Sequence, residues 1–438
     1  MLTKVESDKI LDLLRQEATP TVGGTEPFAI ALAVAKARQL LGEMPERVVV
    51  KLSPKIIKNS FGVPIAGPGA MVGIPAAIAL GAVAGDAERG LDCLDGFSPD
   101  QLKAAQAFVD ERRYAVRPSH SFEIIYIEVE ATAGEHESRV IIAKECTHFV
   151  YLKGVDNVIA DERYTLAQEY DRCHESWLNM QLIWDFATTV PLAQLKFLLD
   201  GARMNRKVAE KALEGNYGLN LGKMLLGTFE ERMVGQNIMP KLVCYTCAAC
   251  DVRMSGARVP IMSISGSGNQ GIAGTLPVLI FAESTCCAEA KLQRALALSN
   301  LIIVYIKQLL GHMSSHCSCV IAATGSAAAL AYLMGGDYGD VCAAVKNQIA
   351  SLAGMVCDGA KPSCTLKLST AVSSALQAAM MAKEGICVPP TDGLIETNVD
   401  RSIDNLAAIG RDAMVENDSM ILRILADKEE AEEGVGAV

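Results

Sequence analysis

The chain has 438 residues, of which 50% are hydrophobic and 21% charged, which is enough to bury a large core in two or three domains. Its formal net charge is −11 and it has no run of Lys and Arg, so nucleic acid is excluded as an expected partner, because phosphate binding requires a basic face. The opening residues, MLTKVESDKI, lack the apolar core of a signal peptide, and we therefore expect a cytoplasmic protein.

Residues 1–45 are predicted to form helices that pack on a larger helical domain. The segment KVESDKILDLLRQEA places apolar residues at helical spacing. The next segment, TEPFAIALAVAKARQLL, has Thr25 as its expected N-cap and Pro27 in its first turn, where a missing N–H does no harm.

Residues 46–158 are predicted to form a small α+β domain. The runs RVVVKLS, SFEIIYIEVEATA, SRVIIAK and HFVYLKG are rich in β-branched and aromatic residues, which is typical of strands. AGEHE between two of them resembles a hairpin loop, and helical pieces at 74–84 and 101–110 interrupt the strands.

Residues 159–438 are predicted to be a helical domain, so the expected fold class is α+β, a large all-helical domain plus a smaller α+β domain near the N-terminus. Two stretches, 64–84 and 317–336, carry no charge over about the length of a membrane span. Both consist mostly of Ala, Gly and other small residues, without aromatic belts. This composition favours close-packed helices in a large core, and no membrane partner is expected.

Two glycine-rich stretches are candidates for binding. SISGSGNQGIAGTLPV, at 263–278, can form an anion nest for a carboxylate or phosphate, or a tight turn between packed helices. It is neither a P-loop nor a dinucleotide fingerprint. KNSFGVPIAGPGAMVGIP, at 58–75, is either a structural loop or a ligand-facing one.

The 14 cysteines do not suggest a disulfide framework in a long chain without a signal segment. Cys244, Cys247 and Cys250 form a C-x2-C-x2-C pattern, which is compatible with an iron–sulfur triplet. The surrounding sequence is helical, however, and residues three apart drift around a helix, so buried small side chains are the alternative.

A second cysteine group consists of Cys317 or Cys319, together with Cys357 and Cys364. Glycine and proline place these cysteines near helix starts and turns, where thiol pKa values fall and thiolates are reachable. Thiolates are the soft ligands of iron–sulfur clusters and of zinc, and spacing alone leaves a metal site and a structural role open.

The motifs SGSGNQGI, MVCDGAKPSC, GGTEP and KNSFGV followed by MVGIP resemble those of the iron–sulfur L-cysteine desulfidases, relatives of the alpha chain of bacterial iron–sulfur L-serine dehydratases. The resemblance extends from about Leu14 to Leu422. It implies a 4Fe-4S cluster held by Cys317, Cys357 and Cys364, with one iron open to the substrate.

The activity that this resemblance implies is α,β-elimination from a small β-substituted amino acid, first of all L-cysteine to pyruvate, sulfide and ammonia. A serine dehydratase-like deaminase and a lyase for another small thio or hydroxy acid are alternatives. A non-catalytic cluster-binding or ligand-binding homologue is a further alternative, from another functional class. A small amino acid is the expected partner, and we expect a homo-oligomer.

The substrate-binding prediction rests on position and polar chemistry, and its residues are Ser265, Ser267, Asn269, Gln270 and Asn59.

The proton-transfer residues depart from the family pattern. Relatives have Gly-Cys-Thr-Glu-Pro, with the cysteine as the suggested base, where this chain has Gly24, and His-Thr-Asn where this chain has Cys-Thr-His at 146–148. The candidate proton acceptors are therefore Glu26, Lys58 and His148. A glycine-specific backbone angle is the simpler explanation for Gly24.

Overall fold

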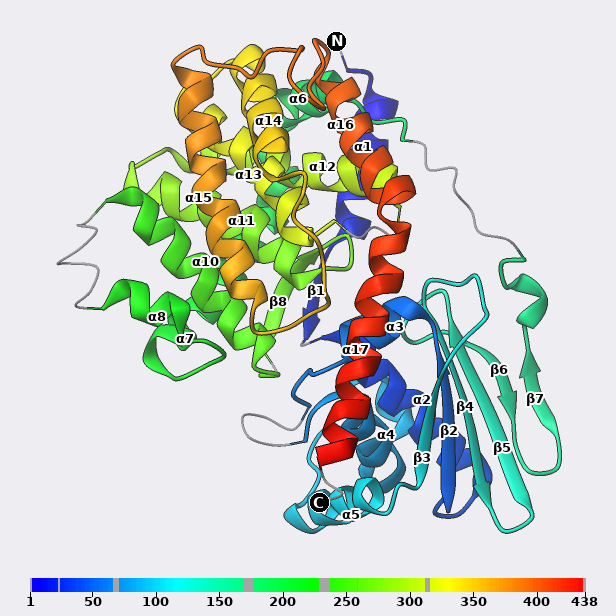
Figure 1. Cartoon of the computed structure of the whole chain (residues 1–438). Coiled ribbons are helices and arrows are strands. Elements are labelled where there is room, and N and C mark those ends of the chain that lie inside the picture. The colour runs from blue at the N-terminus through cyan, green and yellow to red at the C-terminus, as the bar shows by residue number, and fades with distance from the viewer. Residues whose placement is uncertain are drawn as a thin grey trace. The chain divides into compact units, whose positions relative to one another are not determined.

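The computed structural model (Figure 1) describes residues 2–22, 24–65, 71–168, 176–227, 237–257, 259–311 and 316–435. The chain forms two compact units. The helical unit consists of Met1–Gly23, Arg172–Cys357 and Pro362–Val415, and the sheet unit consists of Gly24–Asp171, Asp358–Lys361 and Glu416–Val438. The predicted combination of a large helical domain with a smaller α+β domain is confirmed.

The division of the chain differs from the predicted ranges 1–45, 46–158 and 159–438. Helix α2 (Thr25–Leu41) belongs to the sheet unit, because its apolar side chains share one core with strands and helices of that unit. Phe28, for example, lies in the same buried cluster as Val48 and Ile127. The sheet unit also takes in Asp358–Lys361 and the residues from Glu416 onward.

The sheet unit contains six strands of a mixed sheet and the helices around it. The strands are β2 (Arg47–Leu52), β3 (Tyr114–Pro118), β4 (Tyr126–Ala133), β5 (His136–Ala143), β6 (Phe149–Lys153) and β7 (Val158–Asp161). The helices are α2, α3 (Pro54–Ser60), α4 (Gly73–Ala84), α5 (Pro99–Asp110) and α17 (Val415–Val435), with 3-10 turns η1 (Ala87–Asp92) and η2 (Arg163–Thr165).

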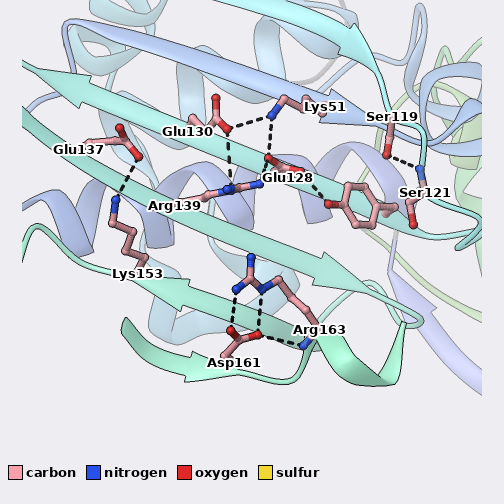
Figure 2. Close-up of polar contacts among 11 residues, drawn as sticks. Lys51, Ser119, Ser121, Glu128, Glu130, Glu137, Arg139, Lys153, Asp161 and Arg163 are labelled. Atoms are coloured by element: carbon pink, nitrogen blue, oxygen red, sulfur yellow. Dashed lines mark hydrogen bonds and ion pairs between the residues drawn. The ribbon is translucent and has the colours of Figure 1, made fainter. Parts of the chain in front are cut away.

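The strand order is β3-β2-β4-β5-β6-β7, with β2 parallel to β3 and all other pairs antiparallel. Because side chains alternate along a strand, Val50 and Val129 face the buried core with α2 and α4. The charged side chains Lys51, Glu128 and Arg139 lie on the other face, where Figure 2 shows them pointing toward one another across β2, β4 and β5.

The helical unit is built from helices and one short ladder. Its helices are α1 (Lys4–Glu17), α6 (Met180–Thr189), α7 (Lys196–Glu214), α8 (Leu221–Leu226), α10 (Ile238–Met254), α11 (Gly268–Ser284), α12 (Glu289–Leu310), α13 (Ser318–Leu333), α14 (Tyr338–Leu352), α15 (Cys364–Lys383) and α16 (Val399–Ala408). A 3-10 turn η3 (Leu192–Leu195) and a π-helical turn η4 (Ile409–Ala413) accompany them. The sequence did not predict its two strands, β1 (Ala18–Val22) and β8 (Pro260–Ile264), which pair antiparallel.

Helix α13 is almost entirely buried, and its packing explains the alanine-rich composition of this segment. It contacts α11, α12, α14 and α15, and its small side chains let neighbouring backbones approach closely. Gly325 lies directly against the Ser299 carbonyl of α12, where a Cβ would not fit.

In the part of the chain that the structure describes, no single helix is long and apolar enough to cross a membrane. One pair of helical segments, Met180–Thr189 with Leu192–Glu214, passes that test together by length and composition and is bent by 113°.

Candidate active site

Two of the predicted cluster ligands stand at the beginnings of helices in the helical unit. Cys317 is the N-cap of α13, and Cys364 is the first residue of α15. The Cys317 N–H donates to the Met355 carbonyl at 3.0 Å, so the segment leading into Cys357 runs beside the start of α13. The partial positive charge of a helix N-terminus favours thiolate over thiol.

Two further thiols are close to these ligands. The Cys319 thiol is hydrogen-bonded to Cys317, and this contact, together with burial, raises the pKa of Cys319 well above its usual value. Burial also raises the pKa of Cys250, with a smaller contribution from Cys364. Cys319 is thus near Cys317, Cys364 and Cys250, and Cys250 is near Cys364, so sulfur is concentrated in one region of the helical unit.

The C-x2-C-x2-C group lies on α10, as its helical pattern predicts, and all three side chains are fully buried. Each thiol is close to a different polar acceptor: Cys244 to the Gly222 carbonyl, Cys247 to a carbonyl of α15, and Cys250 to Asn269 Oδ1. In these contacts the three cysteines act as small buried side chains that join α10 to three neighbouring segments.

No three or more His, Cys, Asp or Glu side chains among the described residues form a group that could hold a metal ion. The ligands of an iron–sulfur cluster need not converge on one point, because each thiolate binds a separate iron. Cys317 and Cys364 supply soft sulfur donors at helix N-termini, and the paired backbone brings the Cys357 segment to the first of them. The donor type and its placement therefore fit a cluster.

The turn between β8 and α11 and the first turn of α11 together hold four of the predicted substrate-binding residues, namely Ser265, Ser267, Asn269 and Gln270. Ser267 is the N-cap of α11, and its side chain accepts from the Gln270 N–H. Ser265 has a positive φ of 47°. Among the described residues, the buried Ser265 Oγ and Gln270 Oε1 have no hydrogen-bond partner. A ligand bound at the start of this helix would supply the missing hydrogen-bond partners of these two buried atoms.

The remaining residue of this group, Asn269 in the first turn of α11, contacts an arginine that the sequence did not predict. Arg253, near the end of α10, is 9% exposed and donates from Nη1 to Asn269 Oδ1 at 3.2 Å. The same Oδ1 lies 3.7 Å from Cys250 Sγ. The signal in the sequence was an arginine near the end of the mostly apolar segment CAACDVRM.

Asp251 is the second buried charge that the sequence reasoning missed. Its carboxylate accepts from the N–H groups of Leu219 and Gly222 and from Thr365 Oγ1 at 3.1 Å. Burial raises the pKa of Asp251, although these hydrogen bonds act in the opposite direction. Because Thr365 follows Cys364, this carboxylate fixes the start of α15 where a predicted ligand stands.

The predicted proton acceptors and the fifth predicted substrate-binding residue, Asn59, lie in the sheet unit. Asn59 Nδ2 donates to Glu26 Oε1 at 2.8 Å, so the structure brings these two candidates together. Cys146 is beside them, and burial, followed by the Glu26 charge, raises the pKa of its thiol to about 12.

The other two candidates for the proton acceptor each lie beside a carboxylate. Lys58, 6% exposed, donates to Asp418 Oδ1 at 2.6 Å. His148 Nε2 lies 3.3 Å from Glu162 Oε2, and 41% of the His148 side chain is exposed.

Gly24, rather than the predicted Thr25, is the N-cap of α2. Its φ of −88° and ψ of 126° are extended values that any residue adopts. A Cβ at this position would meet nothing within 4 Å. The expectation of a glycine-specific backbone angle is therefore wrong, and the residue type at position 24 is not dictated by local geometry.

In the second glycine-rich stretch, 58–75, residues 66–70 lie outside the described residues. On either side of them, Pro64 pairs with Val72 in an antiparallel bridge. In the other quoted motif, CDGA, Gly359 has a φ of +105° and lies against the Lys58 carbonyl, where a Cβ would not fit. Here the local structure does require glycine.

Comparison with known proteins agrees with the motifs. The profile of the serine dehydratase alpha chain matches residues 88–423. The chain is 47% identical over 424 residues to a UPF0597 protein of Bacteroides thetaiotaomicron, covering 97% of this chain and 98% of that protein. It is 43% identical over 426 residues to a UPF0597 protein of Porphyromonas gingivalis (96% and 98%) and 34% identical over 429 residues to one of Aeromonas hydrophila (98% and 98%).

Proposed function

This chain belongs to the serine dehydratase alpha chain family, and on that premise we propose that it is an iron–sulfur-dependent lyase that converts L-cysteine to pyruvate, sulfide and ammonia. The observation that carries the proposal is the concentration of thiols at the starts of α13 and α15, in a chain that matches this family over 88–423. L-Serine, with a hydroxyl as leaving group, is the alternative substrate.

Cys317, Cys357 and Cys364 would hold the 4Fe-4S cluster, which when bound supplies a Lewis-acidic iron for the leaving group of the substrate. In the reaction the α-proton passes to a base, and the bond from Cβ to sulfur or oxygen breaks. The resulting aminoacrylate tautomerises to an imine, and one water hydrolyses the imine to pyruvate and ammonia. The atoms balance without an external oxidant or reductant.

The chain's own residues must orient the amino acid and accept its α-proton. The turn with Ser265, Ser267 and Gln270 offers polar groups at a helix N-terminus, which suits a carboxylate. Glu26 remains the first candidate for the base, since Lys58 is ion-paired with Asp418 while Glu26 accepts only neutral hydrogen bonds from Thr25 and Asn59. This assignment stays a prediction.

The test is reconstitution with iron and sulfide in the absence of oxygen, followed by assays of pyruvate, sulfide and ammonia with L-cysteine and L-serine. We expect equal amounts of pyruvate and ammonia, and with L-cysteine an equal amount of sulfide. Activity should be lost in air and restored by iron and reductant. Turnover that persists in air without bound iron would contradict the proposed mechanism.

Gly24 favours one other functional class, a binding protein without turnover. The iron–sulfur L-cysteine desulfidases that the motifs resemble have a cysteine at this position, and this chain has no side chain there. Calorimetric titration of the reconstituted protein with L-cysteine separates the two classes. Saturable binding without product would support the non-catalytic alternative.

A further inference from the structure

Arg253 is a buried cation for which the described part of the chain offers no carboxylate partner. Its side chain is 9% exposed, and its one hydrogen bond to a described residue goes to the neutral Asn269 Oδ1. Its Nε is buried and has no hydrogen-bond partner among these residues. A guanidinium keeps its charge at all physiological pH values, and burying a charge without a counter-charge is costly.

The position of this cation adds to that cost. Gly268, the first residue of α11, lies directly against the Arg253 side chain, so that even a Cβ would collide with the guanidinium. The guanidinium thus stands at the positive end of a 17-residue helix. The two positive potentials add at one point, and an anion bound there would relieve both.

A second buried polar atom without a described hydrogen-bond partner lies in the first turn of the same helix, α11. Gln270, 1% exposed and in the first turn of α11, has a buried Oε1 without a hydrogen-bond partner among the described residues. This oxygen is an acceptor, whereas the guanidinium is a donor. A cationic donor at the end of α10 and a neutral acceptor in the first turn of α11 match the two charged groups of an α-amino acid, the carboxylate and the ammonium.

We propose that Arg253 binds the carboxylate of the small amino-acid substrate at the N-terminus of α11, while Gln270 Oε1 accepts from the substrate ammonium. The inference rests on the proposed function for the identity of the ligand. Asn269 Oδ1 joins Arg253 to Cys250, which in turn interacts with Cys364. A carboxylate at Arg253 therefore lies in the same part of the helical unit as the sulfur atoms.

The experiment uses L-alanine and L-alaninamide as probes, because neither has a β-leaving group and the second lacks only the carboxylate charge. Calorimetry on the reconstituted wild-type protein without oxygen should give L-alanine at least about tenfold tighter than L-alaninamide. In Arg253→Gln this preference should disappear, through a loss of about 10- to 100-fold for L-alanine alone. Arg253→Lys should recover only part of it, because an ammonium does not bind a carboxylate bidentately.

Arg203→Gln is the matched control, since Arg203 is half-exposed and pairs with Glu289 on the surface. It should leave both affinities unchanged. Thermal unfolding distinguishes ligand binding from a structural role, because loss of a structural role would lower the Tm of Arg253→Gln. Without ligand, Arg253→Gln should be as stable as the wild type or more stable, because it removes an uncompensated buried charge.

An unchanged preference for L-alanine in Arg253→Gln, or wild-type protein that binds neither probe, would overturn the inference. So would equal weakening of both probes together with a lower Tm, which is the result of a structural role. The proposed function fails separately. If L-cysteine and L-serine are not turned over but Arg253 still decides carboxylate binding, the inference holds and the lyase proposal is wrong.

Discussion

Glu128 in the sheet unit and Arg253 in the helical unit are both buried charges, and their surroundings are opposite. Glu128 is 4% exposed and accepts from Lys51 Nζ at 2.8 Å, Arg139 Nη2 at 2.6 Å and Tyr126 Oη at 2.7 Å (Figure 2). Arg253 has a single neutral acceptor among the described residues.

The pKa values of two buried carboxylates, Glu128 in the sheet unit and Asp251 in the helical unit, are shifted in opposite directions. Burial acts to raise the pKa of Glu128, but the hydrogen bonds from Lys51 and Tyr126 and the neighbouring positive charges outweigh it, so its pKa is lowered. Asp251, two residues before Arg253, receives only neutral donors, and burial raises its pKa. Glu128 has its counter-charges within the fold and therefore contributes to stability. Arg253 has no counter-charge among the described residues, which indicates a ligand.

The largest expected effect comes from removing the sulfur ligands. Cys317→Ala, Cys357→Ala or Cys364→Ala should each lose iron and reduce lyase activity to background, because a cluster with two protein thiolates is weakly held. Iron and sulfide analysis with the brown absorbance measures this. Cys286→Ala, at an exposed site, is the control, and retention of iron by all three variants would show that the ligand assignment is wrong.

Gly24→Cys should raise the rate of L-cysteine desulfidation by on the order of a hundredfold, if removal of the α-proton limits the rate of the wild type. The fold should tolerate it within about 0.5 kcal/mol, because the site has ordinary backbone angles and open space. Gly24→Ala controls for the added volume and should give no gain. A fast wild type that Gly24→Cys leaves unchanged would show that another residue is the base.

Within the sheet network, Glu128→Gln should lower the free energy of unfolding by about 2–3 kcal/mol, since Lys51 and Arg139 would lose their buried counter-charge. Urea unfolding measures this. Glu130→Gln is the matched variant at a more exposed site and should cost under about 1 kcal/mol. Iron content should stay at the wild-type level in both, and an equal loss of stability in the two variants would contradict the comparison.

The smallest expected effect is the pH dependence of this network. A carboxylate with a lowered pKa contributes stability that is fully present above its unfolded pKa, about 4.3, and that is lost as the pH falls through the lower folded value. The stability difference between wild type and Glu128→Gln should therefore be constant above about pH 5 and should shrink below pH 4. A difference that persists unchanged at pH 3 would mean that the charge of Glu128 is not its cause.

Local patterns in the sequence predicted much of the fold and less of the site. Alternation and β-branched residues located β4, β5 and β6, and the helical period located α10 and α12. The strands β1 and β8 were missed because each is five residues long and becomes a strand only by pairing with the other. Pairing across such a distance leaves no local periodicity to detect.

The site shows the same limit. The turn at 265–270 and the pair Cys357 and Cys364 were predicted from motifs whose residues are close in sequence, and Cys317 was predicted from its place in the family resemblance. Arg253 was not predicted, because its significance depends on its burial and on the lack of a carboxylate partner among the described residues. A surface arginine and a buried one without a counter-charge look identical in a sequence.

The β1–β8 ladder has a consequence for the order in which the chain can fold during synthesis. Ala18 pairs with Ile264, so β1 leaves the ribosome about 240 residues before its partner and, at roughly 5–20 residues per second, waits on the order of 12 to 50 s. During that interval the backbone N–H and C=O groups of residues 18–22 lack their partners in β8 and are available to pair with other chains. Pro20, at the centre of β1, lacks an N–H, and this interrupts the row of donors that a wrong partner would need.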